Sequence, residues 1–155
     1  MDIEKELEEL LQTANDFNEK KEFGDAIKYF DKALALNPRS SKAMYWKAFM
    51  LYHDMGEILE SLKLCDKCLR EGINTNYDYT ANLLILKADI FCSLSKNEEA
   101  LLLAEKALDI IGNDNTKYAI LQKSYLLYSM MPHLRKRIKK DNKKHRKHFF
   151  HRLFK

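Results

Sequence analysis

Three segments decide the fold of this chain: AIKYFDKALAL at residues 26–36, SLKLCDKCLRE at residues 61–71 and ALLLAEKALDI at residues 100–110. They align without a gap, and each has a small residue at its first position and another at its eighth. The eighth residues are Ala33, Cys68 and Ala107, each between a lysine and a leucine, at spacings of 35 and 39 residues. Self-similarity at this period indicates a chain built from repeated helical units.

A second small residue, followed three positions later by a large one, lies upstream of each segment. These pairs are Ala14 with Phe17, Ala48 with Leu51 and Ala88 with Phe91. Helices whose axes approach within about 8–10 Å need small side chains at the crossing and large ones in the flanking grooves. The pattern therefore predicts three helical hairpins, with the small residues packed where the helices cross.

The sequence predicts helices near residues 2–20, 23–36, 41–54, 57–71, 77–94, 97–111 and 115–131. Residues that suit helix ends support these bounds. They are Ser40 or Ser41 as the cap of the third helix, Ser95 with Glu98 as a capping box for the sixth, Asp114 or Asn115 for the seventh, Asn37-Pro38 as the end of the second, and Gly72 and Gly112 as the ends of the fourth and sixth.

The repeats resemble the tetratricopeptide family, whose helix-turn-helix unit has about 34 residues. The first copy has Ala14, Phe17, Ala26, Phe30, Ala33 and Pro38 at the family's signature positions, with Leu10 in place of its tryptophan. The second copy gains one residue near Gly56, and the third lacks the closing proline. The resemblance implies an all-α, right-handed superhelix of three hairpins with a capping helix and a basic C-terminal extension. The expected domains are a repeat domain at 1–131, with repeats at about 7–40, 41–75 and 81–114 and a capping helix at 115–131, and a tail at 132–155.

Length and composition agree with a small helical protein. A chain of 155 residues with 46% hydrophobic content can bury a core of its own, and 4 glycines and 2 prolines leave little material for β-hairpins. The longest stretch without a charge, residues 124–134, is too short to cross a membrane, which takes about 20 apolar residues. The first residues lack a secretory signal, so we expect a cytoplasmic protein with reduced thiols.

No enzymatic motif stands out, and we expect neither catalysis nor a cofactor nor a metal. Cys65 and Cys68 have the spacing of a zinc or redox pair, but no second ligand pair accompanies them. Both fall on packing positions of the repeat, where a free cysteine serves as a small apolar residue, and Cys92 is expected to pack similarly. The expected function is therefore binding.

The resemblance implies that the first helix of each pair lines a concave surface that holds a peptide or a helix. Large aromatic residues there would suit a binding hot spot, although Tyr45 and Trp46 can equally be core residues. The family's carboxylate clamp for chaperone tails is not expected, because Leu11, Trp46, Asn82 and Leu86 occupy four of its positions. The candidate partner-binding residues are Asn15, Tyr45, Trp46, Phe49, Tyr52, His53 and Asp89.

Charge is distributed unevenly along the chain. Residues 132–155 hold 11 of the 27 lysines and arginines but only one of the 23 acids, Asp141. With Leu134, Ile138 and Phe149 near one helical face, the tail can form a basic amphipathic helix for nucleic acid, anionic lipid, an acidic partner or the acidic body of the chain itself. The alternative is a flexible tail that only adds solubility. The candidate residues are Arg135, Lys136, Arg137, Lys139, Lys140, Lys143, Lys144, Arg146 and Lys147.

The sequence favours a non-catalytic adaptor that binds a protein or peptide in its groove and uses the tail as a second contact. The alternatives are a nucleic-acid or ribosome-associated adaptor that depends on the tail, and a peripheral membrane adaptor. The predicted helix at residues 115–131 is apolar on two faces, so its second face needs the tail, an external partner or a second copy of the chain. A homodimer through this helix or the tail is thus a further expectation.

Overall fold

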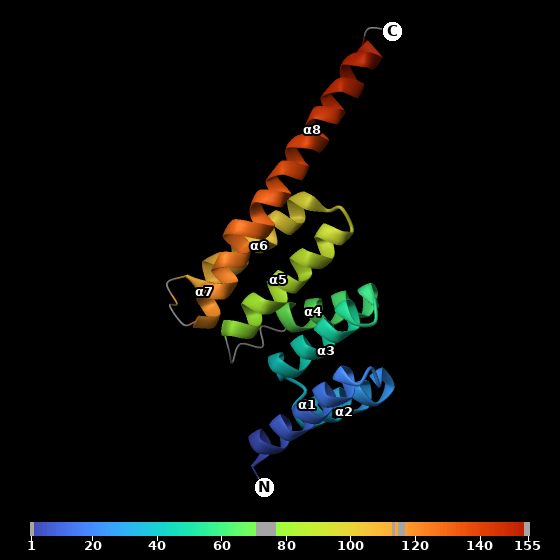
Figure 1. Cartoon of the computed structure of the whole chain (residues 1–155), viewed down its shortest axis with the longest axis vertical. Coiled ribbons are helices and arrows are strands. Elements are labelled where there is room, and N and C mark those ends of the chain that lie inside the picture. Colours follow the sequence, from blue (N-terminus) through green and yellow to red (C-terminus); the bar gives the residue numbers. More distant parts are fainter. Residues whose placement is uncertain (1, 71–76, 113, 115–116, 154–155) are drawn as a thin grey trace. The chain divides into compact units, whose positions relative to one another are not determined.

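The computed structural model describes the backbone of residues 2–70, 77–112, 114 and 117–153, and side chains within these ranges except at 77, 78, 117, 118, 120 and 145–153. All secondary-structure elements among these residues are helices joined by short turns, and no strand occurs among them (Figure 1). The elements are α1 (Ile3–Glu19), α2 (Phe23–Leu36), α3 (Ser41–His53), α4 (Ile58–Arg70), α5 (Tyr77–Ser93), α6 (Asn97–Ile111), α7 (Lys117–Ser124), the π-helical segment η1 (Tyr125–Met130) and α8 (Met131–Leu153). The expected all-α fold is confirmed.

The chain divides into two compact units, residues 1–83 and 84–155. In unit 1, α1 packs along α2, α3 packs along α4, and α2 also contacts α3. The core of this unit surrounds Phe30, which is fully buried. Buried residues of its main cluster are Leu7, Leu11, Ala14, Ala26, Phe30, Ala33, Ala43 and Met50.

Each small residue predicted at a helix crossing is buried. The most exposed of them is Cys68, of whose surface only 4% is accessible to solvent. The set comprises Ala14, Ala26, Ala33, Ala48, Ser61, Cys68, Ala88, Ala100 and Ala107. Ser61 also shows how closely α3 and α4 approach, because its hydroxyl donates to the carbonyl of Ala48 at 2.7 Å. A larger side chain at such a position would have to separate the helices.

The turns that follow α1 and α5 contain the same backbone hydrogen bond. After α1, the N–H of Glu22 donates to the carbonyl of Phe17, and after α5 the N–H of Lys96 donates to that of Phe91, both at 2.9 Å. The residue before each donor has a left-handed backbone, with φ of 61° at Lys21 and 60° at Ser95. The first and third hairpins therefore have the same turn, 74 residues apart in the sequence.

The second hairpin accommodates the predicted extra residue in this turn. Here the N–H of Glu57 donates to the carbonyl of Leu51, six residues back instead of five. The left-handed position falls on Gly56, with φ of 72°. Glycine adopts this conformation without the steric penalty of a Cβ atom, so the inserted residue is absorbed without strain.

Lys21 is expected to be a weak point of the first turn, because an L-residue in the left-handed region costs about 1–2 kcal/mol. The Lys21→Gly variant should raise the free energy of unfolding by about 0.5–1 kcal/mol. The matched control is Lys20→Gly, since Lys20 has φ of −77° and ψ of −2° and gains nothing from glycine there. Urea denaturation checks both variants, and equal effects of the two would contradict the turn geometry.

The helix ends test the predicted caps. The hydroxyl of Ser40 accepts from the N–H of Ala43 at 3.1 Å, and α2 ends at Leu36, directly before Asn37-Pro38, as expected. Gly112 follows the last residue of α6 with φ of 50°, which confirms that end. The predictions for Gly72 and Asn115 lie outside the described residues. The described part of α7 begins at Lys117, and the two residues between it and Asp114 are outside the description too, so the Asp114 cap stays a prediction.

The predicted capping box of Ser95 and Glu98 is wrong. The residue before α6 is Lys96, and no side chain caps the helix there. Ser95 lies instead at the left-handed position of the turn, where it continues the backbone hydrogen bonds that end α5. The turn shared with the first hairpin therefore outweighs the local capping preference of serine.

In unit 2, α6 packs against α7, η1 and α8. One face of this helical run is buried, including Leu126 and Leu134, both with no exposed surface. The helix expected at 115–131 does not end there, because α7, η1 and α8 follow one another without a loop, and Ser124 and Met131 keep helical dihedral angles. The tail therefore does not fold back over this helix, whose outer side exposes Leu121, Leu127 and Tyr128.

None of the described helices combines the length and apolar character needed to cross a membrane.

Candidate functional site

Aromatic side chains form a continuous cluster on one side of α3. The ring of Tyr45 lies 5.2 Å from that of Trp46, 6.0 Å from that of Phe49 and 5.8 Å from that of Tyr79, at the start of α5. The cluster continues along α3, because the ring of His53 lies 4.3 Å from that of Phe49 and 4.6 Å from that of Tyr52. We call Tyr45, Trp46, Phe49, Tyr52, His53 and Tyr79 the aromatic surface.

The sequence of α3 produces this surface through helical periodicity. Met44, Ala48 and Leu51, spaced four and three residues apart, are buried. Tyr45, Phe49 and Tyr52 have the same spacing one position later, and they are half-buried, while His53 is exposed. The helix therefore has a core-facing side of small and aliphatic residues and a partly open aromatic side.

Trp46 belongs to both sides. It is half-buried and packs against the core cluster of unit 1, and its ring also lies 6.0 Å from that of Phe49. Trp46 is therefore partly a core residue and partly a residue of the aromatic surface. Because it is the only tryptophan of the chain, its fluorescence can report on both the core of unit 1 and the aromatic surface.

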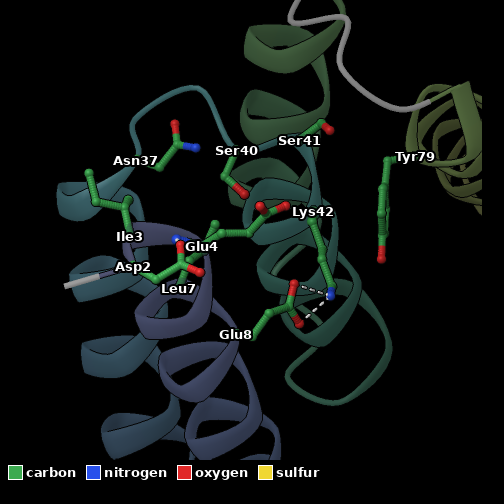
Figure 2. A pocket seen from close by; sticks show the side chains of 10 residues that line it. All are labelled: Asp2, Ile3, Glu4, Leu7, Glu8, Asn37, Ser40, Ser41, Lys42 and Tyr79. Atoms are coloured by element: carbon green, nitrogen blue, oxygen red, sulfur yellow. Dashed lines mark hydrogen bonds and ion pairs between the residues drawn. The ribbon is translucent and has the colours of Figure 1, made fainter.

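A cavity of about 600 Å³ adjoins the aromatic surface at Tyr79. Figure 2 shows it at the N-terminal ends of α1 and α3, with the Lys42 ammonium pointing at the carboxylate of Glu8, with which it pairs. Most of its lining is polar, and Asp2 and Glu4 add two exposed carboxylates. The lining residues are Asp2, Ile3, Glu4, Leu7, Glu8, Asn37, Ser40, Ser41, Lys42 and Tyr79.

The remaining candidates of the predicted concave face lie on other helices. Asn15 is half-buried on α1 in unit 1. Asp89 belongs to unit 2, where it accepts a hydrogen bond of 2.6 Å from the hydroxyl of Tyr125. We do not include Asp89 in the aromatic surface. Of the family's clamp positions, Leu11 and Leu86 are each only 2% exposed and Asn82 only 6%, so these three are packed inside.

Part of the basic tail fastens α8 to its own unit. The guanidinium of Arg137 donates to the carbonyl of Cys92 at 3.2 Å and contacts the hydroxyl of Ser95 at 3.4 Å. One helical turn later, Asp141 accepts from the amide of Asn97 at 3.2 Å. Sequence reasoning missed these contacts, although a single acid within a basic run, four residues after an arginine, could have indicated an anchored face.

The other described basic residues of α8 face solvent. Lys136, Lys139, Lys140, Lys143 and Lys144 are exposed, and Arg135 lies 3.8 Å from the carboxylate of Glu105, an exposed pair that adds little stability. Arg146 and Lys147 lie within α8, but their side chains are outside the described residues. The tail thus separates into an anchoring set and a solvent-facing set.

The cysteines occupy packing positions. Cys65 and Cys68 are buried, Cys92 is half-buried, and none of the three forms a disulfide. Burial raises the pKa of the Cys92 thiol, and the nearby Asp89 carboxylate raises it further, while Arg137 partly opposes both. A raised pKa leaves less thiolate at neutral pH, so the structure provides no activation of this sulfur as a nucleophile.

Alkylation of Cys92 in the folded protein should accordingly be slow. Because the thiolate is the reacting form, the pH of half-maximal rate should lie above that of free cysteine. Iodoacetamide labelling across a pH series, with each thiol quantified by peptide mass spectrometry, measures this midpoint. The urea-unfolded chain is the control, and a native midpoint at or below the unfolded one would contradict the environment described.

Within the described ranges, no three histidine, cysteine, aspartate or glutamate side chains lie close enough to hold a metal ion. A scan of protein-family models finds no match to this chain, and a search of curated proteins finds none either.

Proposed function

We propose that this chain is a non-catalytic protein-interaction module of tetratricopeptide-like type, an adaptor that binds a peptide or a helix against the aromatic surface. The observation that carries the proposal is the half-buried row of Tyr45, Phe49 and Tyr52 along one side of α3. Rings held partly open on a packed helix offer large contact area at a low cost in conformational entropy, as binding hot spots do.

Two structural features support the tetratricopeptide-like part of the proposal. The small residues of all three copies are buried, and the first and third turns repeat the same hydrogen bonds. The partner's identity does not follow from the fold, because similar frames hold many different ligands.

The chemistry of the surface suggests the character of the ligand. Aromatic rings favour apolar or aromatic side chains, and the carboxylates of Asp2 and Glu4 at the adjoining cavity favour a basic residue next to them. An acidic C-terminal motif is a poor candidate, since the clamp positions Leu11 and Leu86 are buried. We therefore propose an apolar peptide with a lysine or arginine at one end.

The proposal can be tested by selecting short peptides from a display library on the full chain. Bound peptides should change the emission of Trp46 and should carry aromatic or aliphatic residues. The Phe49→Ala and Tyr52→Ala variants should each weaken binding by about tenfold or more, since hot-spot truncations cost about 2 kcal/mol. Both side chains are only half-buried, so the variants are expected to stay folded.

Leu59→Ala is the matched control, because Leu59 on α4 is 72% exposed and lies outside the aromatic surface. This variant should bind the selected peptides as the original chain does. Peptides that bind equally well to the Phe49→Ala and Tyr52→Ala variants would contradict the proposal.

A further inference from the structure

The described part of α8 has two faces of different chemistry. Leu134 is fully buried, Arg137 and Ile138 are half-buried, and Asp141 contacts α6, so these positions form the face that packs on unit 2. The opposite face holds Lys136, Lys139, Lys140 and Lys143, at successive spacings of three, one and three residues. Such spacing places all four on one side of a helix. We call these four residues the lysine face.

The helix that carries the lysine face, α8, is packed against α6 and then extends beyond it. Glu105 lies near Arg135 and Asn97 contacts Asp141, so α6 and α8 run antiparallel. Asn97 is the first residue of α6, so beyond Asp141 the helix α8 continues past the N-terminal end of α6. Figure 1 shows this extension. The sequence from 142 to 155 contains six lysines and arginines and no acid.

We infer that the lysine face binds the phosphodiester backbone of nucleic acid. This inference is independent of the proposed peptide site, which lies in unit 1. From Lys136 to Lys143 the helix rises about 10 Å, at about 1.5 Å per residue. A duplex presents about one negative charge per 1.7 Å of axis, so several phosphates lie within reach of four long, mobile lysine side chains.

The side chains described on α8, up to residue 144, disfavour a membrane surface as the partner of the lysine face. A helix that lies in a bilayer interface inserts an apolar face between the lipids. Between residues 134 and 144 of α8, the apolar residues Leu134 and Ile138 pack within unit 2, and no large hydrophobic side chain is exposed among residues 135–144, all of which are described. What this segment offers to a partner is positive charge, which fits a polyanion better than a lipid interior.

The test uses the full chain and two fluorescent probes of about 20 nucleotides, a single-stranded RNA and a duplex DNA, followed by anisotropy between about 50 and 200 mM salt. Binding should weaken steeply with salt. Converting Lys136, Lys139, Lys140 and Lys143 together to glutamine should reduce the slope of log K against log salt by about 3, at about 0.7–0.9 per phosphate contact. The loss of affinity at the lower salt concentration should be at least about tenfold.

The control removes the same charge elsewhere, by converting Lys5, Lys28, Lys63 and Lys106 to glutamine. All four are exposed, and Lys5, Lys28 and Lys63 take part only in exposed ion pairs. This variant should keep most of the affinity. Circular dichroism and thermal unfolding, unchanged in both variants, would show that α8 remains helical and docked.

Three results would overturn the inference. One is no detectable binding of either nucleic acid by the original chain, and the second is an equal loss of affinity in both glutamine variants, which would reflect net charge alone. The third comes from flotation with phosphatidylserine vesicles: binding that depends on the lysine face, in the absence of nucleic-acid binding, would identify a lipid surface instead. None of these results bears on peptide binding at the aromatic surface, which is measured separately.

Discussion

Replacing Phe30 by alanine is expected to lower the free energy of unfolding of unit 1 by about 3–5 kcal/mol. The side chain is fully buried, and it lies in the cluster where α1 and α2 pack together. Its removal leaves a cavity that the surrounding side chains fill only in part, because neighbours such as Ala26 and Ala33 have no rotamers with which to reach into it. This loss is a large part of the stability of a small domain.

Urea denaturation followed by Trp46 fluorescence measures this effect, since Trp46 packs against the same cluster. Leu59→Ala serves as the control, because Leu59 is 72% exposed and its truncation removes little packing. We expect its effect to stay within about 0.5 kcal/mol. A loss below about 1 kcal/mol for Phe30→Ala would show that this residue is not at the centre of the core.

Replacing Ala33 by leucine should destabilise unit 1 by about 1–3 kcal/mol, or more if α1 and α2 cannot separate. The physical cause is opposite to that at Phe30, because here volume is added at a position with no exposed surface. Ala35 gives a matched control two residues later on the same helix, where the side chain is exposed. The same substitution at Ala35 should change stability by no more than about 0.5 kcal/mol.

The comparison between these two leucine variants isolates the requirement for a small residue. Both add the same apolar volume and have the same helix propensity, so any difference in the urea midpoint arises from packing. Equal effects at Ala33 and Ala35 would contradict the interpretation that small residues at fixed repeat positions allow the helices to approach.

Much of the fold could be predicted because its determinants are local and repeated. Small residues at the crossings indicated the hairpins, Pro38 and Gly112 indicated helix ends, and the mismatch between copies located the extra residue at the turn containing Gly56. Each of these features acts over a few residues of sequence, so pattern reasoning captured it.

Other parts of the fold depend on contacts that no local pattern encodes. Ser95 looks like a helix cap in isolation, but the hydrogen bonds of the turn place it in the left-handed region. The contact between Arg137 and the carbonyl of Cys92 joins α8 to α5, 45 residues apart in the sequence, and no local pattern indicated the π-helical segment η1. The sequence shows only a run of basic residues in the tail, whereas in the structure some of them anchor α8 and others face solvent.

The candidate site was predictable to a similar extent. The resemblance to tetratricopeptide repeats pointed to the helix predicted at residues 41–54, whose aromatic composition made Tyr45, Phe49 and Tyr52 candidates. Tyr79 and the cavity beside it were missed, because the contact of Tyr79 with Tyr45 joins residues that are far apart in the sequence. One sequence feature could have found Tyr79: it follows Tyr45 by 34 residues, the length of one repeat.

The central claim is that peptide binding occurs at the aromatic surface and not through the basic helix. The most direct measurement is the affinity of a selected peptide for the full chain, by Trp46 fluorescence or calorimetry, at about 50 and 500 mM salt. We expect an affinity that changes little with salt or with glutamine at the four positions of the lysine face, and that falls at least about tenfold in a Phe49→Ala, Tyr52→Ala double variant. An affinity that falls at high salt and with glutamine at the lysine face, but that the aromatic substitutions leave unchanged, would contradict this claim.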